Sequence, residues 1–208
     1  LVSGYDFLLD SARDISATLR ANGVTDIIGL IDNDWSSQDF RATLFSRAKA
    51  PDLISLNSHF RHYDFFPYEA NGGDPYISAI ELETPGLGAS TSFSGSLVFT
   101  VGCHSGLGAP DSEVAAGDSR ARDWAQAFLR RGATYVGNLG YGYGDSDLNA
   151  YSELLSTKFV RELGDADTIG QALLEAKRQY YGARGNGQFS NYDEKVIGIM
   201  TLYGLPMR

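Results

Sequence analysis

One stretch in the middle of the chain, residues 96–106, constrains the fold more than any other. It begins as an apolar run bounded by glycines, which is typical of a buried central strand. It ends in a turn of small residues that carries Cys103, the only cysteine of the chain. Open α/β sheets bind ligands at the carboxyl ends of their strands, so this thiol stands where such sheets have their active sites. The alternative is that Cys103 is a small buried hydrophobic residue, as free cysteines often are.

Strand and helix patterns alternate along the rest of the chain. This alternation predicts a three-layer α/β sandwich, with a mostly parallel sheet of about six strands and helices on both faces. Residues 60–93 are rich in Pro and Gly and are expected to be irregular, with a short ordered piece near 76–82. Besides the central stretch, the predicted strands are 24–32, 53–58, 134–140 and 196–202; the predicted helices are 6–21, 36–48, 118–131 (capped by Asp118), 147–163 and 168–181.

Composition excludes several classes of protein. The 208 residues are enough for one domain, 1–208, with a sizeable core. The net charge of −9 offers no basic stripe, so no nucleic-acid or membrane partner is expected. A single cysteine excludes an internal disulfide and a Cys-rich zinc site. The chain starts at Leu1, which we interpret as a piece excised from a longer chain with flanking domains.

A histidine and the cysteine follow two of the predicted strands directly. His59 comes at the end of the strand predicted at 53–58, and Cys103 ends the central stretch. If these strands are neighbours, the side chains meet at one edge of the sheet and form a thiol–imidazole pair, in which the imidazole promotes thiolate formation. His104 is a weaker candidate because adjacent residues on an extended strand point to opposite faces. His62, in the following loop, is an alternative base.

Three other stretches fall short of known motifs. Ser105 lies one position away from the serine of a Gly-x-Ser-x-Gly nucleophile elbow. Residues 140–144 lack the third-glycine spacing of a dinucleotide fingerprint, and no P-loop Lys-Ser/Thr follows. Residues 145–149 begin like a calcium loop, but Ala150 and Ser156 occupy the positions that require Gly and Glu. We interpret these acidic residues as capping the next helix.

Taken together and in order, six segments resemble the caspase-type clan of cysteine peptidases, in particular its gingipain-like branch in bacterial multidomain proteins. The resemblance spans nearly the whole chain and implies a caspase-like fold. The segments are 3–8, 56–60, 98–106, 123–128, 140–145 and 201–207.

This resemblance implies roles for the strand-end residues. Cys103 would be the nucleophile that forms an acyl-enzyme, and His59 would protonate the leaving amine. The backbone N–H groups of Phe60 and Cys103 would hold the oxyanion. The chain departs from the family pattern where Phe60 stands in place of a usual glycine and Ser58 replaces another. A backbone donor survives a side-chain change, so these departures concern the loop geometry rather than the dyad.

The resemblance also implies a substrate preference. In this clan a charge at the turn before the first helix selects the P1 side chain, and Asp6 in that turn implies cleavage after Arg or Lys. Asp10 is a second candidate, and the alternative for Asp6 is a simple N-cap. Tyr143, and less directly Tyr141, would form a pocket wall that stacks on an arginine.

The sequence therefore predicts a cysteine endopeptidase, a thiol protease of the hydrolase class, that acts on protein or peptide substrates. A catalytically silent peptidase-like binding or scaffold domain and a cysteine-dependent acyl hydrolase are the alternatives. No cofactor or catalytic metal is expected, and a structural calcium ion is left open because related peptidases often carry one. For the compartment, a secreted or cell-surface bacterial protein is favoured over a cytoplasmic one.

Overall fold

The computed structural model describes residues 1–67, 76–110, 112, 122–146, 148–184 and 189–207. Its centre is a six-stranded sheet in the order β2-β1-β3-β7-β8-β9. Neighbouring strands are parallel except for the antiparallel pair β8 and β9, which confirms the predicted mostly parallel sheet. The strands are β1 (Val2–Gly4), β2 (Gly29–Ile31), β3 (Leu53–Asn57), β7 (Leu97–Thr100), β8 (Thr134–Asn138) and β9 (Met200–Tyr203).

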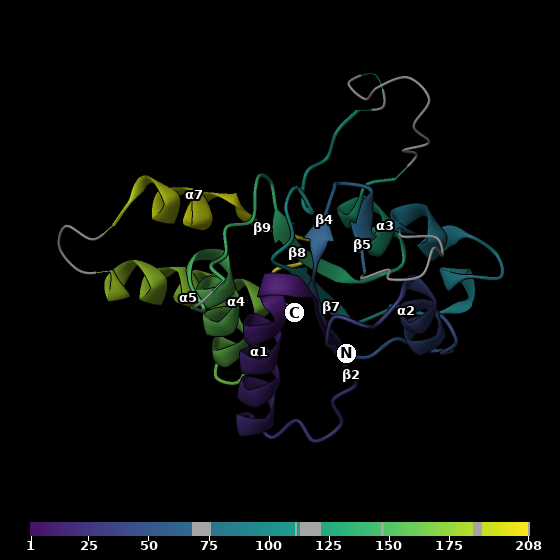
Figure 1. The fold of residues 1–208 in the computed structure, drawn as a ribbon, viewed down its shortest axis with the longest axis horizontal. Coiled ribbons are helices and arrows are strands. Elements are labelled where there is room, and N and C mark those ends of the chain that lie inside the picture. The colour runs from purple at the N-terminus through teal and green to yellow at the C-terminus, as the bar shows by residue number, and fades with distance from the viewer. Residues whose placement is uncertain (68–75, 111, 113–121, 147, 185–188, 208) are drawn as a thin grey trace.

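Helices cover both faces of this sheet, as predicted (Figure 1). One face packs against α1 (Leu9–Ala21), α4 (Tyr151–Glu162), α5 (Ile169–Ala183) and α7 (Asn191–Ile199). The other packs against α2 (Ser37–Leu44) and α3 (Trp124–Arg130), together with the 3-10 helix η2 (Ala79–Glu83). Two further 3-10 helices are η1 (Asp6–Leu8), which precedes α1, and η3 (Gly88–Ser90).

Strand β7 shows why the central stretch begins with a run of apolar residues. All its residues are buried. Leu97 and Phe99 belong to the core under α1, α4 and α5, whereas Val98 belongs to the core under α2 and α3. Successive side chains of a strand point to opposite faces, so a strand covered on both sides needs apolar residues on both of its faces. β7 is therefore a central strand, and Cys103 follows it closely.

A second, smaller sheet lies after β3. Its strands are β4 (His59–Phe60), β5 (Asp64–Phe66) and β6 (Ile77–Ser78), all antiparallel in this order. The expectation that residues 60–93 are irregular is therefore wrong for these strands, because runs of two or three residues are too short to show an alternating pattern. The short ordered piece expected near 76–82 coincides with β6 and η2. His59 is thus the first residue of β4.

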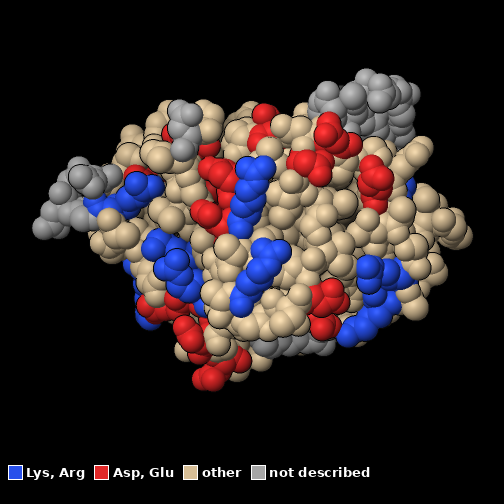
Figure 2. All heavy atoms as spheres, turned by 60° about the horizontal axis from the view of Figure 1, so that its bottom comes forward, with Lys and Arg blue, Asp and Glu red and all other residues tan. Residues whose placement is uncertain are grey.

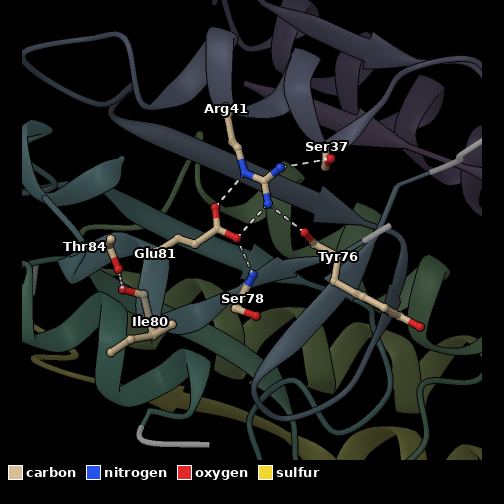
Figure 3. A network of polar contacts seen from close by, with 7 residues as sticks. All are labelled: Ser37, Arg41, Tyr76, Ser78, Ile80, Glu81 and Thr84. Carbon is tan, nitrogen blue, oxygen red and sulfur yellow. Dashed lines mark hydrogen bonds and ion pairs between the residues drawn. The ribbon is translucent and has the colours of Figure 1, made fainter. Parts of the chain in front are cut away.

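Arg41 of α2 ties this second sheet to the main body (Figure 3). Its Nε and Nη2 donate to the two carboxylate oxygens of Glu81 at 2.7 and 2.8 Å. Nη2 also donates to the Tyr76 carbonyl at 2.8 Å, and the Ser78 N–H donates to Glu81 Oε1 at 3.0 Å. A bidentate guanidinium–carboxylate pair fixes direction as well as distance. The pair therefore fixes the β6–η2 corner against α2.

Three other expectations differ from the structure. β2 is confined to Gly29–Ile31 within the predicted strand 24–32. The strand predicted at 196–202 is wrong in its first half, where α7 continues to Ile199 before β9 begins. A capping box starts this helix: Ser190 Oγ accepts from the Asp193 N–H, and the Asp193 carboxylate accepts from the Ser190 N–H. The expectation that the acidic residues of 145–149 cap the next helix is wrong for Asp145, because Ala150 holds the N-cap position of α4 (Tyr151–Glu162) and no side chain caps it. Asp147 and the predicted cap Asp118 lie outside the described residues.

The surface carries both signs of charge. Figure 2 shows one face on which acidic and basic side chains are interspersed. The excess negative charge of the chain is therefore not gathered into a single patch on that face. Within the described part of the chain, no helix combines the length and the apolar character that crossing a bilayer requires.

Candidate active site

The carboxyl ends of β3 and β7 meet at one edge of the main sheet. The two strands pair in parallel, with Leu56 opposite Thr100. His59 comes two residues after β3 and Cys103 three residues after β7. Both side chains line one small hollow. The structure therefore brings His59 and Cys103 to the same site. The hollow is lined by Phe7, Leu8, Ser58, His59, Val101, Gly102, Cys103, Gly142, Tyr143 and Gly144.

Buried polar side chains hold the turn around Cys103. Thr100 Oγ1 accepts from the Gly102 N–H at 2.9 Å, and Ser105 Oγ donates to the Gly102 carbonyl at 2.8 Å. From β8, Asn138 Nδ2 donates to the Val101 carbonyl at 2.9 Å. These groups satisfy backbone atoms that a tight, buried turn would otherwise leave unpaired. The near-miss to a nucleophile elbow thus has a structural explanation, because Ser105 supports the cysteine turn.

Cys103 itself is partly exposed, with its thiol facing the loop after β8. Its Sγ lies 3.7 Å from the Gly142 carbonyl, to which the S–H donates. Within the described residues, the Cys103 N–H has no hydrogen-bond acceptor. The Cys103 N–H is therefore available to donate a hydrogen bond to a bound group. Cys103 is therefore not a fully buried hydrophobic residue.

Phe60 brings strand β4 close to the turn that carries Cys103. A Cβ on Gly102 would lie only 2.3 Å from Cδ2 of the Phe60 ring, so only glycine fits there. The N–H of Arg61 bonds the Asp64 carbonyl at 2.8 Å, which makes Arg61 and Asp64 a hydrogen-bonded pair of the β4–β5 hairpin. Such pairs alternate along an antiparallel ladder, so the Phe60 N–H points away from β5.

His59 contacts Asp6 and two aromatic rings. Its Nε2 lies 3.1 Å from Asp6 Oδ2, and the rings of Tyr5 and Phe7 approach it edge-on at 5.8 and 5.6 Å. Both members of the pair are about half exposed, at 45% and 54% of their side chains. Asp6 has φ +58°, an uncommon conformation for a residue other than glycine. The N-cap alternative for Asp6 is wrong, because Tyr5 and Leu8 hold the cap positions of η1 and α1.

The other predicted residues divide into those at the hollow and those away from it. Tyr143 lines the hollow, and its ring also lies 5.9 Å from Lys195 Nζ. Tyr141 is 65% exposed and packs against His104. His62 and His104 line a different, open groove beside Leu107.

Asp10 lies in the first turn of α1. There its Oδ1 accepts the Ser11 N–H at 2.7 Å. In the described structure it makes no contact with His59 of the kind that Asp6 makes.

Sequence reasoning missed Glu153, which lies beneath the glycine-rich wall of the hollow. Its side chain is fully buried, and its Oε2 accepts the Asp145 N–H at 3.0 Å. Burial, with a smaller contribution from the nearby charges of Asp10 and Asp145, raises the pKa of Glu153 to about 8, although backbone N–H groups of Asp145 and Ala150 act in the opposite direction. No local motif marks Glu153; only its distance from Gly144, which the fold creates, reveals it. Across the described residues, no group of three or more His, Cys, Asp or Glu side chains is arranged to hold a metal.

Solved structures with the same fold include cysteine proteinases. A crystal structure of the Arg-specific cysteine proteinase gingipain R matches with a TM-score of 0.67 and 13% identity, over 99% of this chain and 45% of that chain. A complex of the pro- and mature domains of Porphyromonas gingivalis RgpB matches with a TM-score of 0.63 and 14% identity, over 99% and 46%. The chain thus spans less than half of these proteins. No family model and no curated protein matches the sequence.

Proposed function

We propose that this chain is a cysteine endopeptidase that uses Cys103 and His59 and prefers a basic P1 residue. The observation that carries the proposal is that both side chains line one hollow at the carboxyl ends of adjacent parallel strands. Cysteine proteinases with the same fold support it. In the described structure the thiol and the imidazole bond to Gly142 and Asp6 rather than to each other. Catalytic contacts often tighten only when substrate binds.

The chemistry follows from these two groups. The Cys103 thiol passes its proton to His59, and the sulfur forms a bond with the scissile carbonyl carbon while an electron pair moves to the oxygen. When the C–N bond breaks, His59 gives that proton to the leaving amine. Water then attacks the thioester, His59 takes its proton, and the released sulfur recovers it. The products are a carboxylic acid and an amine, which become a carboxylate and an ammonium group by proton exchange, with no net change in the enzyme.

Two backbone amides are proposed to hold the negative oxygen. The Cys103 N–H has no acceptor within the described residues, and the hairpin ladder directs the Phe60 N–H away from β5. The Phe60 side chain packs against Gly102, so the segments that carry the two amides are neighbours. Fixed donors at a developing oxyanion provide a large share of the rate enhancement in acyl transfer.

The preference for Arg or Lys is proposed from acidic groups beside the hollow. Asp6 contacts His59, which lines the hollow, and Glu153 lies beneath the glycine-rich wall of the hollow. The gingipain R structure is described as Arg-specific, which agrees with this preference. The substrate is proposed to be a protein or peptide, and flanking domains of a longer parent chain remain part of the proposal.

Hydrolysis of fluorogenic peptides with Arg, Lys, Asp, Asn or Leu at P1 tests the proposal. We expect turnover after Arg and Lys that disappears in Cys103→Ala and falls at least about a hundredfold in His59→Ala. His62→Ala, whose side chain lines a different groove, is the matched control and should retain activity.

Three results would contradict parts of the proposal. Turnover only after Asp, Asn or Leu would retain the dyad and reject the basic preference. Hydrolysis of simple esters without peptide cleavage would indicate an acyl hydrolase. Absence of all turnover, with no labelling of Cys103 by an arginyl chloromethyl ketone, would indicate a silent binding or scaffold domain.

A further inference from the structure

We infer that the buried carboxyl of Glu153, rather than Asp6, is the group that recognises the cationic P1 side chain. This inference rests on the proposed peptidase function and assigns its specificity to one residue. It makes Glu153 the counter-ion of a guanidinium or ammonium group brought by the substrate.

Glu153 is buried without a counter-ion. Its side chain has no exposed surface, and within the described part of the chain its Oε1 accepts no hydrogen bond. The charges that act on it, Asp10 and Asp145, are both acidic. Burying a carboxyl with an unsatisfied oxygen among like charges costs free energy, so such a group is expected to serve a ligand.

The carboxyl lies directly behind the wall of the hollow. A Cβ built on Gly144 would lie 3.0 Å from Glu153 Cδ and 3.0 Å from its Oε2. The same point is 2.6 Å from Cε2 of Phe7, so the Phe7 ring and the carboxyl are neighbours. Both Gly144 and Phe7 line the hollow beside Cys103. A P1 side chain entering this hollow would meet the carboxyl once the Phe7 ring turns aside.

The two other acidic candidates already accept hydrogen bonds or contact another residue of the protein. The Asp6 carboxylate bonds the ring of His59 at 3.1 Å and is about half exposed, so its charge is largely screened by water. Asp10 accepts the Ser11 N–H within its own helix turn. A guanidinium that pairs with a buried carboxylate is screened much less than one that pairs at the surface, and a bidentate pair adds geometric selectivity.

Ligand binding to a catalytically inactive protein tests the inference independently of turnover. The protein is Cys103→Ala, and the probes are Nα-acetyl-arginine amide and its neutral isostere, Nα-acetyl-citrulline amide. Isothermal titration should show the arginine probe binding more tightly. Adding Glu153→Gln should weaken arginine binding by roughly 30-fold or more and leave citrulline binding unchanged. Adding Asp6→Asn, the matched control, should change the preference by less than about threefold.

The pH dependence gives a second readout. Because the pKa of Glu153 is raised to about 8, binding of the arginine probe must first ionise the carboxyl. Affinity should therefore rise up to about tenfold per pH unit between pH 6 and pH 8, and Glu153→Gln should abolish this rise. The charged groups facing the carboxyl are Asp10 and Asp145.

Several outcomes would overturn the inference. These are an unchanged arginine preference in Glu153→Gln, a loss that appears in Asp6→Asn instead, or equal binding of both probes to Cys103→Ala. If Glu153→Gln does not fold, Gly144→Ala provides the test, because its methyl group would block the path and should weaken the arginine probe equally. Turnover of the fluorogenic peptides by the wild type tests the peptidase function separately. A failure of the Glu153 assignment can therefore be distinguished from a failure of the peptidase proposal.

Discussion

At the level of single residues, the contact between Asp6 and His59 has an effect on catalysis that can be measured directly. Asp6 holds a left-handed conformation while its carboxylate reaches the imidazole. Unfavourable backbone conformations persist at functional sites where the surroundings hold them in place. We therefore interpret Asp6 as a positioning residue that orients the ring of His59 toward substrate.

Asp6→Asn should lower kcat of the peptidase by about tenfold and leave KM for an arginyl substrate nearly unchanged. The reason is that the amide keeps the size of the side chain but loses the charge that orients the imidazole. Steady-state kinetics over a range of pH checks this, since a positioning role also alters the pH profile of kcat. Asp52→Asn, which neutralises an exposed carboxylate that pairs with Lys49, is the matched control. A rise in KM confined to basic substrates would instead assign Asp6 to the P1 pocket.

Single residues also show what the sequence could and could not reveal. His59 and Cys103 each follow a recognisable strand, so simple sheet topology predicts that they meet. The approach of Asp6 to His59 depends on a positive φ and on the Asn33 side chain, which accepts the Asp6 N–H. Glu153 is buried only because α4 packs under the glycine-rich loop. Neither arrangement leaves a local pattern in the sequence.

At the level of secondary structure elements, the ion pair of Arg41 and Glu81 should determine whether the second sheet, which carries His59, is held against the main body (Figure 3). The side chains are only 19% and 10% exposed. Arg41→Ala should reduce the free energy of unfolding by about 3 kcal/mol, because it leaves the buried Glu81 carboxylate without its cation. Chemical denaturation checks this value.

Lys49→Ala provides the control for Arg41→Ala. Lys49 and Asp52 form an ion pair at 2.8 Å whose side chains are 63% and 84% exposed. Exposed pairs contribute little, so this variant should lose less than about 1 kcal/mol. Equal losses in the two variants would show that the network around Arg41 is not a structural anchor.

Elements were predictable where their pattern was long. The helices α1 and α5 carry a full apolar stripe, and both agree with the predicted ranges to within a few residues. The apolar run at 196–202 could be read as either type of element, because short apolar runs do not distinguish a strand from a helix. The capping box at Ser190 and Asp193 decides for a helix, and it starts upstream of that run. The strands of the second sheet are shorter than any reliable periodic signal.

At the level of the whole molecule, two cores share one sheet. The side chains of β7 alternate between them, so the layers cannot separate without exposing both cores. This arrangement explains why the overall architecture follows from the sequence, since alternating strand and helix patterns have few compact solutions. It also means that a charge buried between a helical layer and the edge of the sheet changes the free energy of unfolding of the whole molecule.

Glu153 predicts how the stability of the whole molecule depends on pH. Its pKa is about 8 in the folded protein and near its ordinary value of 4.5 when unfolded. Between these values the folded state binds one more proton, so the free energy of unfolding falls as pH rises, by up to about 1.4 kcal/mol per pH unit from this group. The stabilisation is complete below pH 4.5 and is lost as pH passes through about 8.

Glu153→Gln removes this titration and isolates it from every other group. Urea denaturation of both proteins at intervals from pH 4.5 to pH 8.5 should show the wild type losing stability relative to the variant as pH rises. The difference should stop growing above about pH 8, where the carboxyl is ionised in both states. A difference independent of pH would mean that Glu153 is already ionised at neutral pH in the folded protein. The carboxyl would then need no substrate cation to hold its charge, and its proposed role in selecting P1 would lose its physical basis.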